Sequence, residues 1–114
     1  MQNAYEEIAA DSGSEARLRE REALLQSIVA MEEADLNPSD PAKRMNAIVL
    51  VNRLWTVLVS DLASAQNHYP RELKAQLISI GFFIMRQLDA VRNDETKDFA
   101  AIVEISRTLE QGLA

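Results

Sequence analysis

The sequence predicts an all-α fold, a single-domain bundle of four longer helices preceded by a short N-terminal helix. Apolar residues recur at helical spacing in four stretches of the 114-residue chain, without the strict alternation of a strand. Prolines and short polar links separate these stretches, which favours antiparallel neighbours. Because a domain commonly holds about 100–150 residues, we expect residues 1–114 to form one domain.

The N-terminal third is predicted to contain two helices. The first covers about residues 3–10, and we expect residues 1–11 to form a mobile arm. Ser12 and Glu15 have the spacing of a capping box, in which each side chain satisfies a free backbone N–H, so a second helix should start there. This helix is expected to pack by one apolar stripe, widened by Leu24 and Met31 and otherwise composed of Leu18, Leu25, Ile28, Val29 and Leu36.

A third helix is predicted over Pro41–Ala63. Asp40 is a good N-cap, and Pro41 suits the first helical position. Apolar residues cover more than half of the circumference of this helix, which predicts the central helix of the bundle. The most apolar run of this helix, Ala47–Val59, is interrupted by Asn52 and Arg53 and is shorter than the roughly 20 residues of a membrane span, so we expect it to lie in a protein core.

Two further helices complete the predicted bundle. One starts near Pro70 and ends near Arg92, with an apolar stripe of Leu73, Leu77, Ile80, Ile84, Leu88 and Val91. Gly81 beside this stripe costs about 1 kcal/mol relative to alanine, so we expect close approach of a neighbouring helix there. The last helix ends near Gly112 and presents Phe99, Ile102, Val103, Ile105 and Leu109 on one face.

Charge and composition limit the possible partners and compartments. Residues 1–40 hold ten acidic side chains and three arginines, and the net charge of the chain is −6. A phosphate backbone repels such a surface, so direct nucleic-acid binding is disfavoured. The chain has no cysteine, and its N-terminus lacks a basic segment followed by an apolar one; we therefore expect a cytoplasmic protein without a secretory signal.

The residues that commonly carry catalysis or hold cofactors are scarce. His68 is the single histidine and lies in a polar link, where a surface position is the simpler interpretation than a zinc ligand. Glu6-Glu7 and Glu32-Glu33 are adjacent pairs that point about 100° apart on a helix. The glycine-rich phosphate loops and the common catalytic motifs do not occur. We expect no enzyme, no metal and no cofactor.

Aromatic residues on two of the predicted helices suggest a binding surface instead. Phe83 points away from the stripe that contains Leu77 and Ile84, and the adjacent Phe82 cannot enter the same narrow seam. Phe83 is either buried between two neighbouring helices or an aromatic anchor for a partner. Trp55 poses the same choice, and its apolar neighbours at helical spacing favour a core position.

At these residues the sequence resembles the FlaF family of alphaproteobacterial flagellar biosynthesis regulators. The resemblance covers nearly the whole chain and is carried by Arg53–Leu58 with Asp61–Ala63, by Leu77–Arg86, and by Ile102–Leu109 before Gly112-Leu113. Phe83 stands where the family pattern often has tryptophan, and Phe82 replaces an aliphatic residue.

The resemblance implies a role in flagellin production or export, an association with the flagellin regulator FlbT, and the activity of a cytoplasmic secretion chaperone. A helix bundle of this kind can shelter an amphipathic segment in a groove. The expected partners are therefore flagellin and FlbT, with no membrane. We expect the partner-binding residues to be Trp55, Leu58, Phe82, Phe83, Met85 and Arg86.

Two other functions fit the same sequence. The chain could be a post-transcriptional regulator of flagellin messenger RNA acting through FlbT, which a gel shift would test because phosphate contacts are sensitive to salt. It could also be a self-associating scaffold, since surplus apolar surface supports association with further copies.

Overall fold

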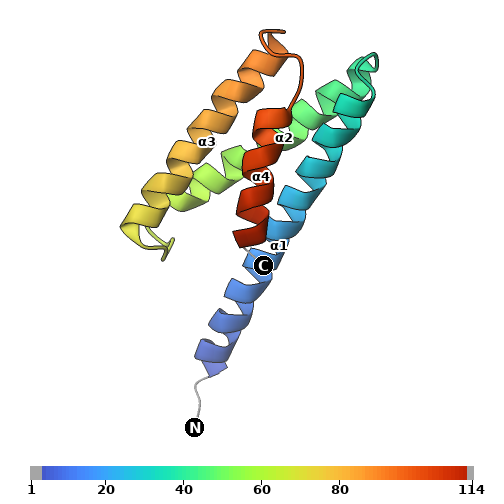
Figure 1. Cartoon of the computed structure of the whole chain (residues 1–114). Helices are drawn as coiled ribbons and strands as arrows, with labels where there is room; N and C mark the ends of the chain where they lie inside the picture. Colours follow the sequence, from blue (N-terminus) through green and yellow to red (C-terminus); the bar gives the residue numbers. More distant parts are fainter. Residues whose placement is uncertain (1–3, 113–114) are drawn as a thin grey trace.

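The protein is a bundle of four helices. The structure, a computed structural model, describes residues 4–112, with side chains from residue 15 to residue 112. The helices are α1 (Ala4–Leu36), α2 (Pro41–Ala63), α3 (Arg71–Arg92) and α4 (Ala100–Gly112), as Figure 1 shows. Residues 4–112 contain no strand, which confirms the predicted all-α class and its four longer helices.

The separate N-terminal helix was a wrong prediction. α1 runs without a break from Ala4 to Leu36, so the expected second helix does not start at a capping box of Ser12 and Glu15. One Gly13 costs about 1 kcal/mol in a helix interior, which is too little to interrupt a helix that contains no proline. Residues 1–3 lie outside the described part of the chain, and the mobility of residues 1–11 stays a prediction.

α2 begins and ends as predicted and lies between α1 and α3. The Asp40 carboxylate accepts hydrogen bonds from the backbone N–H groups of Ala42 at 3.0 Å and Lys43 at 3.3 Å, with Pro41 in the first turn. By length and composition alone, α2 is the one helix of residues 4–112 that could cross a membrane. Core helices of soluble proteins pass the same test, so the expectation of no membrane stays a prediction.

The link between α3 and α4 is fixed by long-range contacts of Arg44 and Asp35. Asp94 has a positive φ of 58° and pairs with Arg44 of α2, whose guanidinium also donates to the carbonyl oxygen of Val91 at the end of α3. Asp35 of α1 accepts a hydrogen bond from the backbone N–H of Phe99, at 3.2 Å from each carboxylate oxygen. These contacts hold the link against α2 and the start of α4 against α1.

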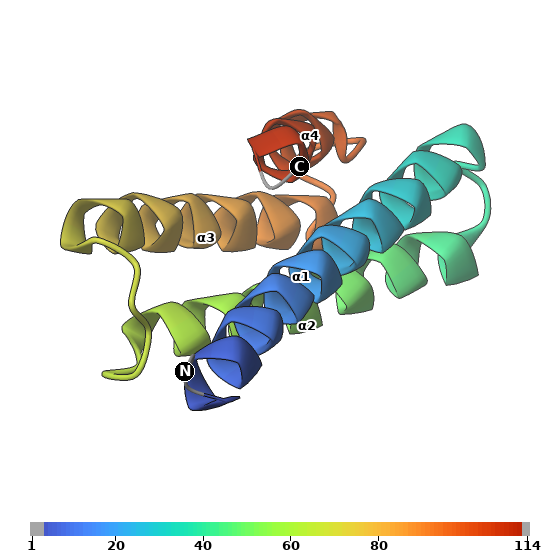
Figure 2. The same cartoon turned by 90° about the horizontal axis from the view of Figure 1, so that it is seen from below.

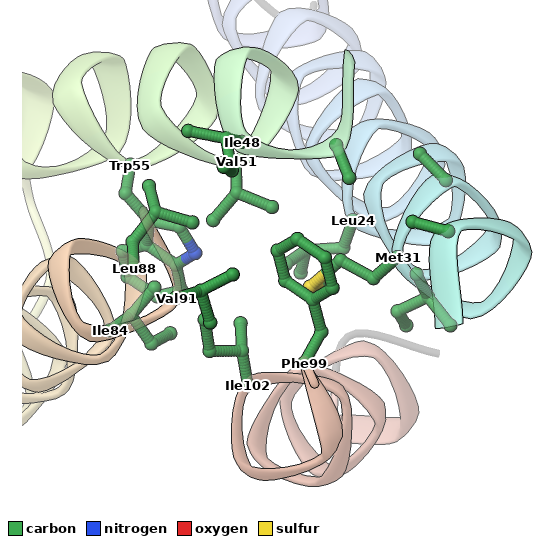
Figure 3. Packing of buried hydrophobic residues seen from close by; sticks show 14 residues of the cluster. Leu24, Met31, Ile48, Val51, Trp55, Ile84, Leu88, Val91, Phe99 and Ile102 are labelled. Carbon is green, nitrogen blue, oxygen red and sulfur yellow. The ribbon is translucent and has the colours of Figure 1, made fainter. Parts of the chain in front are cut away.

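The core contains side chains from all four helices. Figure 3 shows Trp55 of α2 beside Leu88 and Ile84 of α3, and the ring of Phe99 pointing toward Met31 of α1. Phe99 is 1% exposed although it lies just before α4, so the chain buries an aromatic ring where the last helix starts. Burial of one such side chain stabilises the fold by about 1.5–3 kcal/mol.

The predicted packing face of α1 was wrong in part, because several members of the predicted apolar stripe are exposed. Leu18, Val29 and Leu36 are 55%, 61% and 82% exposed, and Leu25 is 38% exposed. α1 lies against α2 and α4, as Figure 2 shows. Leu24, Ile28 and Met31 of the predicted stripe are buried, and Ser27, Ala30 and Ala34 complete the buried face. Its small residues are a signal that a search for large aliphatic side chains does not detect.

Candidate partner-binding site

The shortness of α4 leaves one end of the bundle uncovered. α4 has 13 residues, whereas α2 has 23 and α3 has 22. At 1.5 Å per residue, α4 covers roughly 20 Å of a hairpin that is more than about 30 Å long. Figure 1 shows that α4 ends part-way along α3, before it reaches the end of the bundle where the link between α2 and α3 lies.

An apolar cavity, here called the four-helix pocket, lies at this uncovered end. Its volume is about 260 Å³, and its wall combines residues of all four helices with Tyr69 of the link between α2 and α3. A cavity of about 150 Å³ lined by aliphatic and aromatic side chains accepts benzene, so this pocket has room for one or two large apolar groups. Its apolar lining residues are Leu24, Trp55, Leu58, Leu62, Leu73, Leu77 and Leu109.

Two carboxylates lie at the rim of the four-helix pocket. Burial and the negative charge of Asp61 raise the pKa of Glu20, and the cations of Arg17 and Arg19 oppose this shift. Burial, followed by the charge of Glu20, raises the pKa of Tyr69. Two carboxylates therefore lie at an apolar opening, with Arg17 and Arg19 near enough to offset part of their charge.

Trp55 contributes to the pocket wall from within the core. It is 2% exposed, which confirms the predicted core position. A β-carbon built on Gly81 would lie 3.1 Å from Cε3 of the indole, so glycine permits the close approach of α3 and α2 that the sequence predicts. The ring can shape the pocket, but it cannot project into solvent as an anchor.

The predicted partner-binding residues do not form one surface. Trp55 and Leu58 both line the four-helix pocket. Phe83 and Met85 are half-buried and pack against the core, so Phe83 is neither sealed inside the bundle nor fully exposed. Phe82 is 54% exposed, Arg86 is also exposed, and neither lines the pocket. Their role in binding stays a prediction.

The sequence patterns did not predict several pocket residues, because these residues are distant from one another in the chain. Leu24, Leu73, Leu77 and Leu109 come from three helices, and each belongs to an ordinary amphipathic pattern. Their convergence depends on where α4 ends relative to the α2–α3 hairpin. The predicted stop near Gly112 was the available signal, since Gly112 itself lines the pocket.

The expected surface position of His68 is confirmed, because this residue is exposed. Within residues 15–112, no group of three or more His, Asp or Glu side chains could hold a metal ion. The expectations of no metal, no cofactor and no enzymatic activity stay predictions.

Comparison with known proteins gives one match of nearly full length. The family described as flagellar protein FlaF matches residues 1–113. The chain belongs to the FlaF family. This FlaF relationship makes it a flagellar protein and confirms the resemblance seen in the sequence. No curated protein and no solved structure matches the chain.

Proposed function

We propose that the chain binds unassembled flagellin in the cytoplasm as a secretion chaperone and promotes its production or export. Membership of the FlaF family supports the flagellar context. The single observation that carries the binding role is the four-helix pocket, an apolar cavity of about 260 Å³ at the uncovered end of the bundle.

The pocket suits an amphipathic segment better than a small polar ligand. Seven of its lining residues are apolar, and its walls come from rigid helices rather than from long loops. Such a site takes the apolar face of a helix by receiving one or two large side chains as anchors. A chaperone that uses it would cover apolar surface on flagellin until the subunit is exported.

The acidic rim adds a preference within this class of client. Burial, followed by repulsion from the charge of Asp61, raises the pKa of Glu20, and Arg17 and Arg19 offset only part of this shift. A lysine or arginine next to the apolar anchor of the client would relieve this repulsion. We therefore expect the bound flagellin segment to carry a basic residue beside its inserted apolar side chain.

Calorimetric titration with purified flagellin monomer tests the proposal. Leu73 lines the pocket and is 38% exposed, so Leu73→Asp places a charge in the opening without replacing a core residue. We expect this change to weaken flagellin binding by at least about 30-fold, as for a hot-spot residue. The matched control is Val49→Asp on α2, a residue that is also 38% exposed and lies outside the pocket.

Equal affinities of Leu73→Asp, Val49→Asp and the parent protein would exclude the pocket as the flagellin site. A gel shift with flagellin messenger RNA separates the chaperone from the alternative regulator. Binding of that RNA by the chain alone, together with no detectable binding of flagellin, would overturn the proposed function.

A further inference from the structure

Four exposed aliphatic side chains of α1 within residues 15–36, here called the α1 stripe, form a surface that the rest of the bundle leaves largely uncovered. Leu18, Leu25, Val29 and Leu36 lie within about 40° of one another on a helix that advances about 100° per residue. The stripe extends over about 27 Å of the helix axis. α1 packs against α2 and α4, and Leu25 and Val29 also line a shallow depression beside Asn46 and Leu50 of α2. All four side chains of the stripe are at least 38% exposed.

The positions in the α1 stripe have a symmetry that fits a second copy of the same helix. Leu18 and Leu36 are equidistant from position 27, and so are Leu25 and Val29. Two antiparallel α1 helices related by a two-fold axis at position 27 would therefore place Leu18 level with the second copy's Leu36, and Leu25 level with its Val29. Such isologous contact is the usual geometry of a homodimer.

The charges beside the α1 stripe select the antiparallel orientation. All three described arginines of α1 lie between residues 17 and 21, whereas residues 32–35 contain three acidic side chains and no basic one. A parallel pair would place the acidic segment of one copy beside the acidic segment of the other. The antiparallel pair sets the acidic segment opposite the segment of Arg19 and Arg21. Within one copy Arg21 already pairs with Glu110 and Glu32 with Arg107, so the charges contribute to the orientation more than to the strength of the contact. Glu22 would also face the acidic segment, which keeps the contact from becoming strong.

We propose that the α1 stripe is the interface of an antiparallel homodimer. A single pair of helices in contact over about 27 Å makes a small interface, in the class below about 1,200 Å² where association is weak and reversible. The dimer therefore dissociates on dilution. The four-helix pocket lies on the other side of α1, between Leu24 and the other helices, so the pairing leaves the pocket open. The dimer does not depend on the proposed binding of flagellin.

Sedimentation equilibrium of the full chain tests the dimer at concentrations up to about 1 mM, where even a complex with a Kd near that value is populated. The average mass should rise from 12.8 kDa toward twice that value. Val29→Asp places a charge at the centre of the α1 stripe and should hold the mass at 12.8 kDa. The matched control is Val57→Asp on α2, where the valine is 67% exposed, and this variant should associate like the parent.

A parent protein that stays monomeric throughout this range would overturn the dimer, and so would equal association of the Val29→Asp and Val57→Asp variants. If the Val29→Asp variant associates as strongly as the parent but binds flagellin more weakly, the stripe contacts the client and the dimer is wrong. Far-UV circular dichroism of each variant shows that the helices remain folded.

Disulfide cross-linking tests the orientation, because the chain has no cysteine of its own. Chains carrying Leu18→Cys and tagged chains carrying Leu36→Cys are mixed and oxidised. The antiparallel dimer predicts a cross-link between the two kinds of chain, since paired positions fall within disulfide reach. Cross-links of Leu18→Cys chains with one another would require parallel helices and would overturn the arrangement. A chain with Val57→Cys should not cross-link to either.

Discussion

Gly81 of α3 lies directly against the indole of Trp55 in α2. A β-carbon on this glycine would lie 3.1 Å from Cε3 of the ring and 2.7 Å from Cγ2 of Val59. Trp55 is 2% exposed and Val59 is β-branched, so neither side chain can move without a loss of packing. The glycine therefore sets the separation of α2 and α3, and this separation places Trp55 in the wall of the four-helix pocket.

Gly81→Ala should lower the free energy of unfolding by about 1 kcal/mol. Alanine is the better helix former by about 1 kcal/mol, but forcing a methyl group into a packed interior typically costs about 1–3 kcal/mol. Urea denaturation followed by circular dichroism measures the difference. Gly112→Ala is the control, because a β-carbon there meets nothing within 4 Å. An unchanged or higher urea midpoint for Gly81→Ala would mean that α3 can shift at no cost.

Ser106→Ala should stabilise the protein by about 1 kcal/mol. Ser106 of α4 is 1% exposed, and its Oγ is the one buried side-chain polar atom within residues 15–112 that has no hydrogen-bond partner. Removing an unsatisfied buried hydroxyl recovers its desolvation cost, typically about 1–3 kcal/mol, and the small cavity that remains offsets part of this gain.

Ser27→Ala is the matched control for that change. Ser27 is also 1% exposed, but its Oγ donates to the carbonyl oxygen of Leu24 at 2.7 Å. Because the hydroxyl already has a partner, its removal should not raise the free energy of unfolding. Equal thermal midpoints for the two alanine variants would contradict the assignment of Ser106 as unsatisfied.

Asp35→Asn should make the protein more stable at pH 7, with an advantage that shrinks in acid. Burial, followed by the charges of Asp98 and Glu32, raises the pKa of Asp35 above its ordinary value of 3.8, against the hydrogen bond from the N–H of Phe99 and the cation of Arg44. The folded state therefore binds the proton more tightly than the unfolded chain does. Stability from this group rises as pH falls through the raised pKa toward 3.8.

The amide of the Asp35→Asn variant has no charge to desolvate, and its oxygen can still accept the hydrogen bond from Phe99. Chemical denaturation at a series of pH values measures the comparison with the parent. Asp35→Ala removes the acceptor as well as the charge and should be less stable than Asp35→Asn at every pH. An advantage of Asp35→Asn that grows as pH falls would reverse the sign of the inferred pKa shift.

Local signals predicted most of the helix boundaries. Asp40-Pro41 marks the start of α2 because a carboxylate cap and a proline each act within one turn, and α2 begins there. The absence of proline near Gly13 was the local signal that was misjudged, so one long helix was divided into two. A capping box indicates that a helix can start, not that a preceding helix must end.

The choice of buried face and the candidate site depended on information that no single helix contains. α1 carries a stripe of large aliphatic residues and a face of small and mixed residues, and hydrophobicity alone favours the first. The fold buries the second, on which Ala30 and Ala34 lie together with Leu24, Ile28 and Met31. The four-helix pocket depends on the relative lengths of α2, α3 and α4, so side chains such as Leu73 and Leu109 could not be assigned to it from their own patterns.

Phe82→Ala and Phe83→Ala should separate the two neighbouring phenylalanines of α3. Phe82 is 54% exposed, so its truncation should change the free energy of unfolding by no more than about 0.5 kcal/mol. Phe83 packs half-buried against the core, so its truncation should cost about 1–3 kcal/mol, below the range for a fully buried phenylalanine. Urea denaturation gives both values. Neither side chain lines the four-helix pocket, so binding by the pocket alone predicts that both variants, measured under folding conditions, bind flagellin like the parent, whereas the partner-binding role expected from the sequence predicts a loss of affinity. If Phe82→Ala loses affinity while its stability is unchanged, the exposed side of α3 contacts flagellin, and the binding surface extends beyond the pocket.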